Sequence, residues 1–229
     1  PEAPIDTIAA LYLLAFGMKA AAFPVNFWLP ASYHTPKIVV AAVFAGLLTK
    51  VGVYAILRTL VMLMPAEGVA LSAIVGWVAG LTMVIAALAA LAQTEIRRAL
   101  GFLVIAGIGA MLAGLAVGSP LALSGTIVYA VHSILAMTAI YLAVGAVERV
   151  AGSSSLATVG GVYATNPLLA ALFLMLALAV AGLPPFSGFW PKAILVKASL
   201  AAGEGWLAGA VLVSGFLQTV ALGRIWLLA

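Results

Sequence analysis

Four ionisable side chains interrupt long apolar stretches of this sequence. They are Lys19, Lys50, His132 and Lys192. A lysine at the centre of an apolar span costs about 2.5–3.5 kcal/mol, so it implies a polar partner or water nearby. Desolvation disfavours a charged ammonium, and an imidazole ordinarily changes its charge between about pH 5 and 8. Both types of side chain can therefore accept and release protons, and their positions predict a proton-transfer pathway.

Lys50 and His132 each lie near the middle of an apolar run. Lys50 is the twelfth residue of the run 39–63, and His132 is the twelfth residue of the run 121–147. Lys50 is too far from either end to extend easily to a membrane surface. Two simpler roles stay open, which are a structural salt bridge for Lys50 and a hydrogen bond to a backbone carbonyl for His132.

The other two lysines flank proline breaks. Lys19 precedes a break at Pro24, and Lys192 follows a break at 184–185. Broken backbone is tolerated in a bilayer only where it is buried in protein or lines a wet cavity. A pair of such breaks points to the ion site of a transporter. The alternatives are two ordinary kinks, with lysines that extend to the membrane surface.

Membrane-spanning helices are the elements that must position these residues. A span needs about 20 mostly apolar residues. The stretches that qualify run roughly over residues 5–23, 38–63, 69–91, 99–117, 121–147, 167–202 and 206–229. The sequence therefore predicts an all-α, polytopic transmembrane helix bundle with two proline-broken, discontinuous helices.

Composition agrees with lipid as the solvent of this chain. The 229 residues are 66% hydrophobic and 7% charged, whereas a soluble domain carries about 25% charged residues. Cysteine is absent, and no phosphate-binding glycine motif, nucleophile elbow or metal-binding cluster occurs. We therefore expect no cofactor, no metal site and no enzyme active site. The net charge of +4 is scattered, which argues against a nucleic-acid partner.

Basic residues are concentrated in alternate connections between the expected spans. Cytoplasmic loops are enriched in lysine and arginine. Lys37, Arg97, Arg98 and Arg149 all lie in or next to loops that alternating spans would place on one side. We therefore predict that loops 31–37, 93–98 and 148–166 are cytoplasmic.

Three segments carry a resemblance to a known family. They are GMKAAAFPVNFWLPASYHTP at 17–36, AGLLTKVGVYAILR at 45–58, and GLPPFSGFWPK at 182–192. These segments resemble the antiporter-like membrane subunits of complex I, membrane hydrogenases and multisubunit Mrp-type cation/proton antiporters. The sequences of residues 33–36 and 97–102 are most similar to those of the D subunits of the Mrp-type antiporters. The chain begins with proline and ends within a helical pattern, so we interpret it as part of a longer protein.

The resemblance implies two inverted five-helix repeats, each with one discontinuous helix. Residues 1–63 would end the first repeat, and residues 69–229 would form the second. Many relatives carry a lysine shortly after the histidine, where this sequence reads Leu-Ala-Met-Thr at 135–138. Many also begin the fourth span with serine and histidine, where residues 104–109 are apolar.

The same resemblance assigns a role to each of the four residues. Lys19 matches the lysine of the first discontinuous helix, and Lys50 matches the central bridging lysine. His132 matches the histidine of the intervening helix. Lys192 matches the terminal ionisable residue of the second discontinuous helix. The glutamate that pairs with the first lysine in relatives would lie before residue 1.

These observations predict proton or cation translocation by a component that resembles the D subunit of a multisubunit Na⁺/H⁺ antiporter. The expected partners are other membrane subunits, the lipid bilayer, H⁺ and Na⁺, and the expected location is the bacterial inner (cell) membrane. One alternative is a proton-pumping subunit of complex I or of a membrane-bound hydrogenase. A second alternative is a non-conducting scaffold bundle, in which removing the four charges would leave transport intact.

Overall fold

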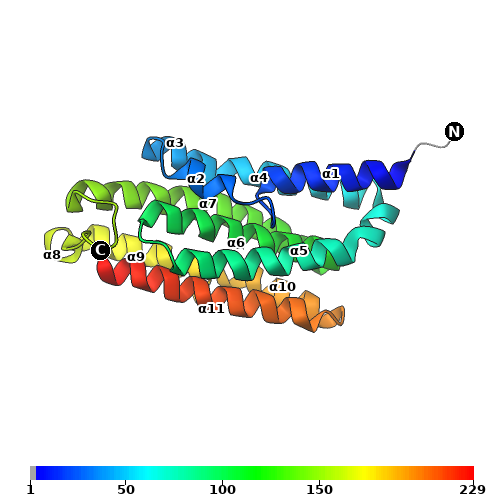
Figure 1. The fold of residues 1–229 in the computed structure, drawn as a ribbon. Coiled ribbons are helices and arrows are strands. Elements are labelled where there is room, and N and C mark those ends of the chain that lie inside the picture. Colours follow the sequence, from blue (N-terminus) through cyan, green and yellow to red (C-terminus); the bar gives the residue numbers. More distant parts are fainter. Residues whose placement is uncertain (1–3) are drawn as a thin grey trace.

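The computed structural model describes residues 4–229, and this part of the chain is all-α. The elements are α1 (Ile5–Ala20), α2 (Trp28–Tyr33), α3 (Ile38–Val43), η1 (Phe44–Leu48), α4 (Thr49–Ile56), η2 (Leu57–Leu63), α5 (Pro65–Leu91), α6 (Ile96–Val117), α7 (Pro120–Ala151), α8 (Val162–Thr165), α9 (Pro167–Ala181), α10 (Phe189–Ala201) and α11 (Gly205–Leu228). The long helices run roughly parallel or antiparallel to one another in one elongated bundle (Figure 1). The predicted polytopic helix bundle is confirmed.

Five helices within residues 4–229 are long and apolar enough to cross a membrane. They are the continuous helix Ile38–Leu63, then α5, α6, α7 and α11. The first and sixth expected spans differ from these, because α1 has 16 residues and α9 has 15. Each of the two short helices ends at a break, and the chain resumes as α2 or α10.

Both predicted breaks are present, and each contains a cis peptide bond before a proline, at Pro24 and at Pro185. After α1, the chain turns through Ala21, which adopts the left-handed conformation with φ 60°. The backbone N–H of Phe23 then donates to Thr82 Oγ1 of α5 at 2.9 Å. The break is therefore fixed against a neighbouring helix and is not a simple kink.

The helix Ile38–Leu63 contains two π-helical segments, η1 and η2, that the sequence analysis did not predict. Such segments are rare and are frequent at functional sites. At η1 the helix passes close to α7, because a Cβ added at Gly46 would lie 3.1 Å from the carbonyl oxygen of Ile134. Glycine permits this approach, and η1 ends two residues before Lys50.

Helix α6 lies at the centre of the bundle, in contact with α5, α7, α10 and α11 (Figure 1). Most of its residues are buried. Small residues let the helix backbones approach closely, as is usual in membrane bundles. At Gly109, for example, an added Cβ would lie 2.8 Å from the carbonyl oxygen of Ala79 in α5.

The three loops that we predicted to be cytoplasmic lie together at one end of the bundle. Arg97 forms an ion pair with Glu148, and its Nη1 donates to the carbonyl of Pro36 at 3.1 Å. The N–H of Ile96 donates to the carbonyl of Ser154 at 3.1 Å. These contacts place the loops on a shared side, and the cytoplasmic assignment of that side stays a prediction.

Candidate functional site

Lys50 is buried in α4, with 5% of its surface exposed. Its Nζ donates to the carbonyl oxygen of Ala45 at 2.5 Å, and Ala45 belongs to the π-helical segment η1. The ion pair found within residues 4–229 joins Arg97 at the start of α6 to Glu148 near the end of α7. The structural salt bridge that we considered for Lys50 is therefore not formed in this part of the chain, and its polar partner is a carbonyl.

Lys192 is also buried, with 8% exposure, and lies in the first turn of α10. Its Nζ donates to the carbonyl of Ala181 at 2.6 Å and to Oε1 of Gln218 at 3.1 Å. Ala181 is the last residue of α9, where helical carbonyls lack an intrahelical partner and carry the negative end of the helix dipole. The break after α9 thus provides the acceptor, and burial excludes extension to the membrane surface.

Gln218 connects Lys192 to two further groups. Its Nε2 donates to Ser214 Oγ at 2.8 Å, and Ser214 Oγ donates to the carbonyl of Met83 in α5 at 3.2 Å. All three side chains are buried. The sequence analysis missed Gln218 and Ser214. Their spacing of four residues within an apolar helix was the available signal, because it places them on one face.

His132 lies half-buried on α7 and contacts the broken segment between α9 and α10. Its Nδ1 is 3.0 Å from Ser187 Oγ, and its Nε2 lies 2.8 Å from the position that a Cβ at Gly188 would occupy. Its partner is therefore a hydroxyl group and not the backbone carbonyl that we considered. Lys50 lies four residues beyond Gly46, which packs against Ile134 of α7, and Ile134 is two residues after His132.

Lys19 lies in the last turn of α1, and its side chain is exposed in the described part of the chain. The helix that carries it does pack on α4, since a Cβ at Gly52 would lie 2.6 Å from the backbone nitrogen of Ala20. The structure therefore brings His132 and Lys192 to one broken segment and places Lys50 nearby. It does not bring the Lys19 side chain into a buried site.

Two buried hydroxyl groups beside these residues have no hydrogen-bond partner in the described chain, namely Thr49 Oγ1 and Ser133 Oγ. Thr49 precedes Lys50, and Ser133 follows His132. Buried hydroxyls are normally hydrogen-bonded to protein or to ordered water. Each of the two hydroxyls is therefore free to bind water next to one of the buried ionisable residues.

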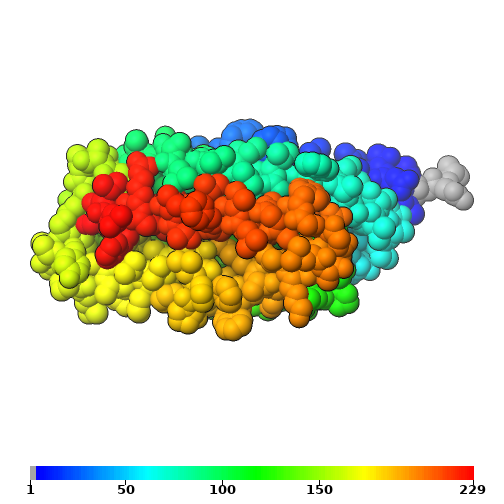
Figure 2. All heavy atoms as spheres, turned by 90° about the horizontal axis from the view of Figure 1, so that it is seen from below, coloured from blue at the N-terminus to red at the C-terminus, as the bar shows by residue number. Residues whose placement is uncertain are grey.

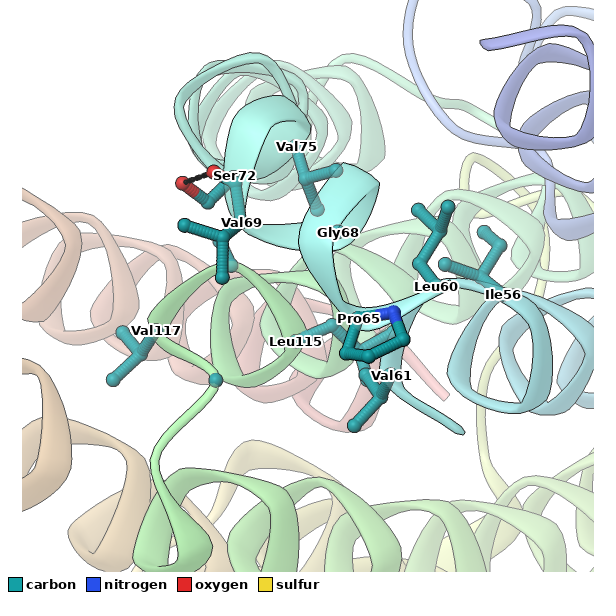
Figure 3. Close-up of a pocket in the computed structure, with 12 residues that line it drawn as sticks. Ile56, Leu60, Val61, Pro65, Gly68, Val69, Ser72, Val75, Leu115 and Val117 are labelled. Atoms are coloured by element: carbon teal, nitrogen blue, oxygen red, sulfur yellow. Dashed lines mark hydrogen bonds between the residues drawn. The ribbon is translucent and has the colours of Figure 1, made fainter. Parts of the chain in front are cut away.

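A cavity at the opposite end of the bundle from the Arg97–Glu148 pair has no ionisable lining residues, unlike the region around Lys192 and His132. It measures about 360 Å³ and lies where η2, the start of α5 and the end of α6 meet (Figure 3). Its lining includes Leu60, Val69 and Leu115, and the Ser72 hydroxyl donates to the carbonyl of Val69 at 2.7 Å. None of its lining residues is ionisable, so we do not include it in the candidate site.

The sequence matches the family model described as "NADH:quinone oxidoreductase/Mrp antiporter, TM" over residues 4–218. The chain belongs to this family. It is 37% identical to the D subunit of the Na(+)/H(+) antiporter of Alkalihalophilus pseudofirmus, covering 98% of this chain and 46% of that protein. It is 34% identical to the D subunit of the Na(+)/H(+) antiporter of Bacillus subtilis, covering 97% and 45%. The chain thus spans less than half the length of these curated relatives.

Solved structures of the family share the fold. A chain of the Mrp complex from Dietzia sp. DQ12-45-1b superposes with a TM-score of 0.92 at 34% identity, covering 96% of this chain and 41% of that one. A chain of respiratory complex I from Thermus thermophilus gives a TM-score of 0.89 at 26% identity, covering 96% and 47%. The antiporter-like fold that the sequence resemblance implied is therefore confirmed.

Proposed function

We propose that this chain translocates protons through Lys50, His132 and Lys192, as part of a component equivalent to the D subunit of a multisubunit Na⁺/H⁺ antiporter. The observation that supports this most strongly is the broken segment between α9 and α10. His132 lies against one side of it, and Lys192 bonds to the carbonyl of Ala181 at its start. Two titratable groups thus share one interrupted stretch of backbone, where a wet cavity can be tolerated.

Each group in this proposal has a defined task. Lys192 exchanges a proton while the carbonyl of Ala181 and the amide of Gln218 hold its nitrogen in place. His132 passes the proton along the broken segment, and Lys50 continues the path at η1. Water bound at Thr49 and Ser133 would bridge the intervals, since both hydroxyls are buried and unpartnered in the described chain.

Lys19 belongs to the same proposal as the next site along the path. It lies beside Ala20, whose backbone packs on Gly52 of α4. We propose, with the sequence resemblance, that residues 1–63 and 69–229 belong to two inverted repeats, so that Lys19 and Lys192 occupy corresponding breaks. Residues of the longer protein would cover the exposed Lys19 side chain.

The proposed partners are H⁺, Na⁺, lipid and the other membrane subunits of the assembly in the bacterial cell membrane. The relatives named as antiporter subunits support a transporter component over a redox enzyme. The match to complex I supports a second candidate function. In that function the chain belongs to a proton pump driven by redox chemistry in other subunits. Sodium dependence distinguishes the two, because only the antiporter predicts proton flux that starts when Na⁺ is added.

The test compares Lys192→Ala with Lys197→Ala in the whole protein within its assembly. Both lysines lie on α10, but Lys192 is buried and hydrogen-bonded whereas Lys197 is exposed. In everted vesicles, sodium-dependent proton flux should be lost in the first variant and retained in the second. Retained flux in Lys192→Ala would contradict the proposal and favour the scaffold bundle.

A further inference from the structure

A cavity of about 650 Å³ lies between α10 and α11. Figure 2 shows this face, on which the orange-yellow and orange-red helices lie side by side with a hollow between them. The volume falls in the range of about 300–1,000 Å³ that small-molecule sites occupy. Most of the lining is apolar and includes Leu183, Phe189, Val196, Leu212 and Phe216.

Two lysines, Lys192 and Lys197, provide the charge in this lining. The only uncharged polar side chain among the lining residues is that of Thr219. An apolar wall with one polar hydroxyl does not replace the hydration shell of a metal cation, and two lysines repel a cationic ligand. The cavity therefore favours an apolar molecule that carries a negative charge.

The Lys192 nitrogen lies beside a glycine that lines this cavity. A lysine ammonium has three N–H donors, and Lys192 uses two of them on Ala181 and Gln218. The nitrogen lies 3.8 Å from the position that a Cβ at Gly215 would occupy, and Gly215 lines the cavity. Gly215 therefore places no side chain between the cavity and a nitrogen that has one donor left unused.

We propose that this cavity binds a single-chain amphiphile with a carboxylic acid head group, such as a long-chain fatty acid, with its head at Lys192. Its hydrocarbon chain lies along the apolar wall formed by α10 and α11. This chemistry fits both features of the cavity, because the apolar lining takes the chain and the lysine nitrogen takes the acid. Lys197 lines the same cavity and is exposed, which adds attraction for an approaching carboxylate.

The binding step needs no further reactant. A neutral acid transfers its proton from the carboxyl oxygen to a neutral Lys192 nitrogen, so one O–H bond breaks and one N–H bond forms. Alternatively, a carboxylate that meets the ammonium form of Lys192 accepts a hydrogen bond from the third N–H of that ammonium group. Both routes end in the same charge-assisted hydrogen bond, which is stronger than a neutral one. Binding uses the nitrogen that the proposed function makes a proton carrier, so a bound carboxylate would hold the proton on Lys192 and oppose transport.

Photolabelling with a diazirine analogue of palmitate tests the proposal in the whole protein within its membrane assembly. Labelled peptides should come from α10 and α11. Gly215→Leu places a side chain into the cavity and should lower this labelling about tenfold, a loss equivalent to one strong interaction. Gly209→Leu is the matched control on α11, because a Cβ there meets no atom within 4 Å and Gly209 does not line the cavity.

Competition defines the head group. Excess palmitate should abolish the labelling, whereas hexadecanol and hexadecylamine should not. Equal competition by hexadecanol, or unchanged labelling in Gly215→Leu, would overturn the proposal. Labelling of a neighbouring subunit in place of α10 and α11 would overturn it too, because a protein partner would then fill the cavity. If Gly215→Leu fails to assemble, Lys192→Gln provides the second variant and should also reduce labelling about tenfold.

Discussion

Replacing Gln218 by glutamate should slow transport at least tenfold while leaving the fold intact. The amide oxygen of Gln218 lies 3.1 Å from Lys192 Nζ, so the carboxylate of Gln218→Glu would form an ion pair with the lysine at that distance. At an effective dielectric constant of about 20, two unit charges at this separation attract by about 5 kcal/mol. Each proton that leaves Lys192 would have to overcome part of this attraction.

A fraction of that energy is sufficient for a large effect, since about 1.4 kcal/mol changes a rate tenfold. We therefore expect at least a tenfold loss of sodium-dependent proton flux in Gln218→Glu, measured in everted vesicles by fluorescence quenching. Assembly should be normal, because glutamate has the size and shape of glutamine, and the Ser214 hydroxyl can rotate its one proton from the carbonyl of Met83 to the new carboxylate.

Gln218→Leu is the matched control for this prediction. Leucine has a similar volume but removes the acceptor without adding charge, so Lys192 keeps only the carbonyl of Ala181 as its partner. Flux should fall less in this variant than in Gln218→Glu. Wild-type flux in an assembled Gln218→Glu variant would refute the reasoning. A carboxylate 3.1 Å from Lys192 Nζ must slow the release of protons from this lysine if the lysine carries them.

Two further predictions concern the structural elements around the site. Gly188→Ala should lower the unfolding free energy by about 1–3 kcal/mol, since its Cβ would clash with the carbonyl oxygen of Ala179 and would lie 2.8 Å from His132 Nε2. Gly209→Ala, whose Cβ meets no atom within 4 Å, should be neutral in the same thermal-unfolding assay. Equal melting temperatures for the two variants would show that Gly188 is not tightly packed against Ala179 and His132. Glu148→Gln should destabilise by about 1–2 kcal/mol, because Arg97 would lose its charged partner at a partly exposed position, and the melting-temperature difference from wild type should narrow in the presence of high salt.

Much of the fold was predictable because its signals are local in sequence. Apolar runs of membrane length and prolines within them indicate helices and breaks directly. Lys50 and Lys192 are buried as their positions in those runs suggested. The π-helical segments η1 and η2 have no comparable signature, and they depend on the close packing of helices such as the contact between Gly46 and α7.

The partners of the site residues were less predictable, because they come from segments far apart in the sequence. Ser187 meets His132 across 55 positions, and Gln218 meets Lys192 across 26. Whether a polar side chain in an apolar helix faces a lysine or only a neighbouring backbone depends on how the helices rotate in the bundle. The role of Lys19 stays a prediction, since its side chain is exposed in residues 4–229 and no contact there fixes its function.

Proton transfer through the buried lysines can be tested directly by measuring sodium-dependent proton flux in everted vesicles for Lys50→Ala, with the whole protein in its assembly. Lys37→Ala is the control, because Lys37 is exposed at the loop end of the bundle. We expect Lys50→Ala to assemble normally and to lose the flux, while Lys37→Ala keeps it. Wild-type flux in an assembled Lys50→Ala variant would contradict proton transfer through the buried lysines.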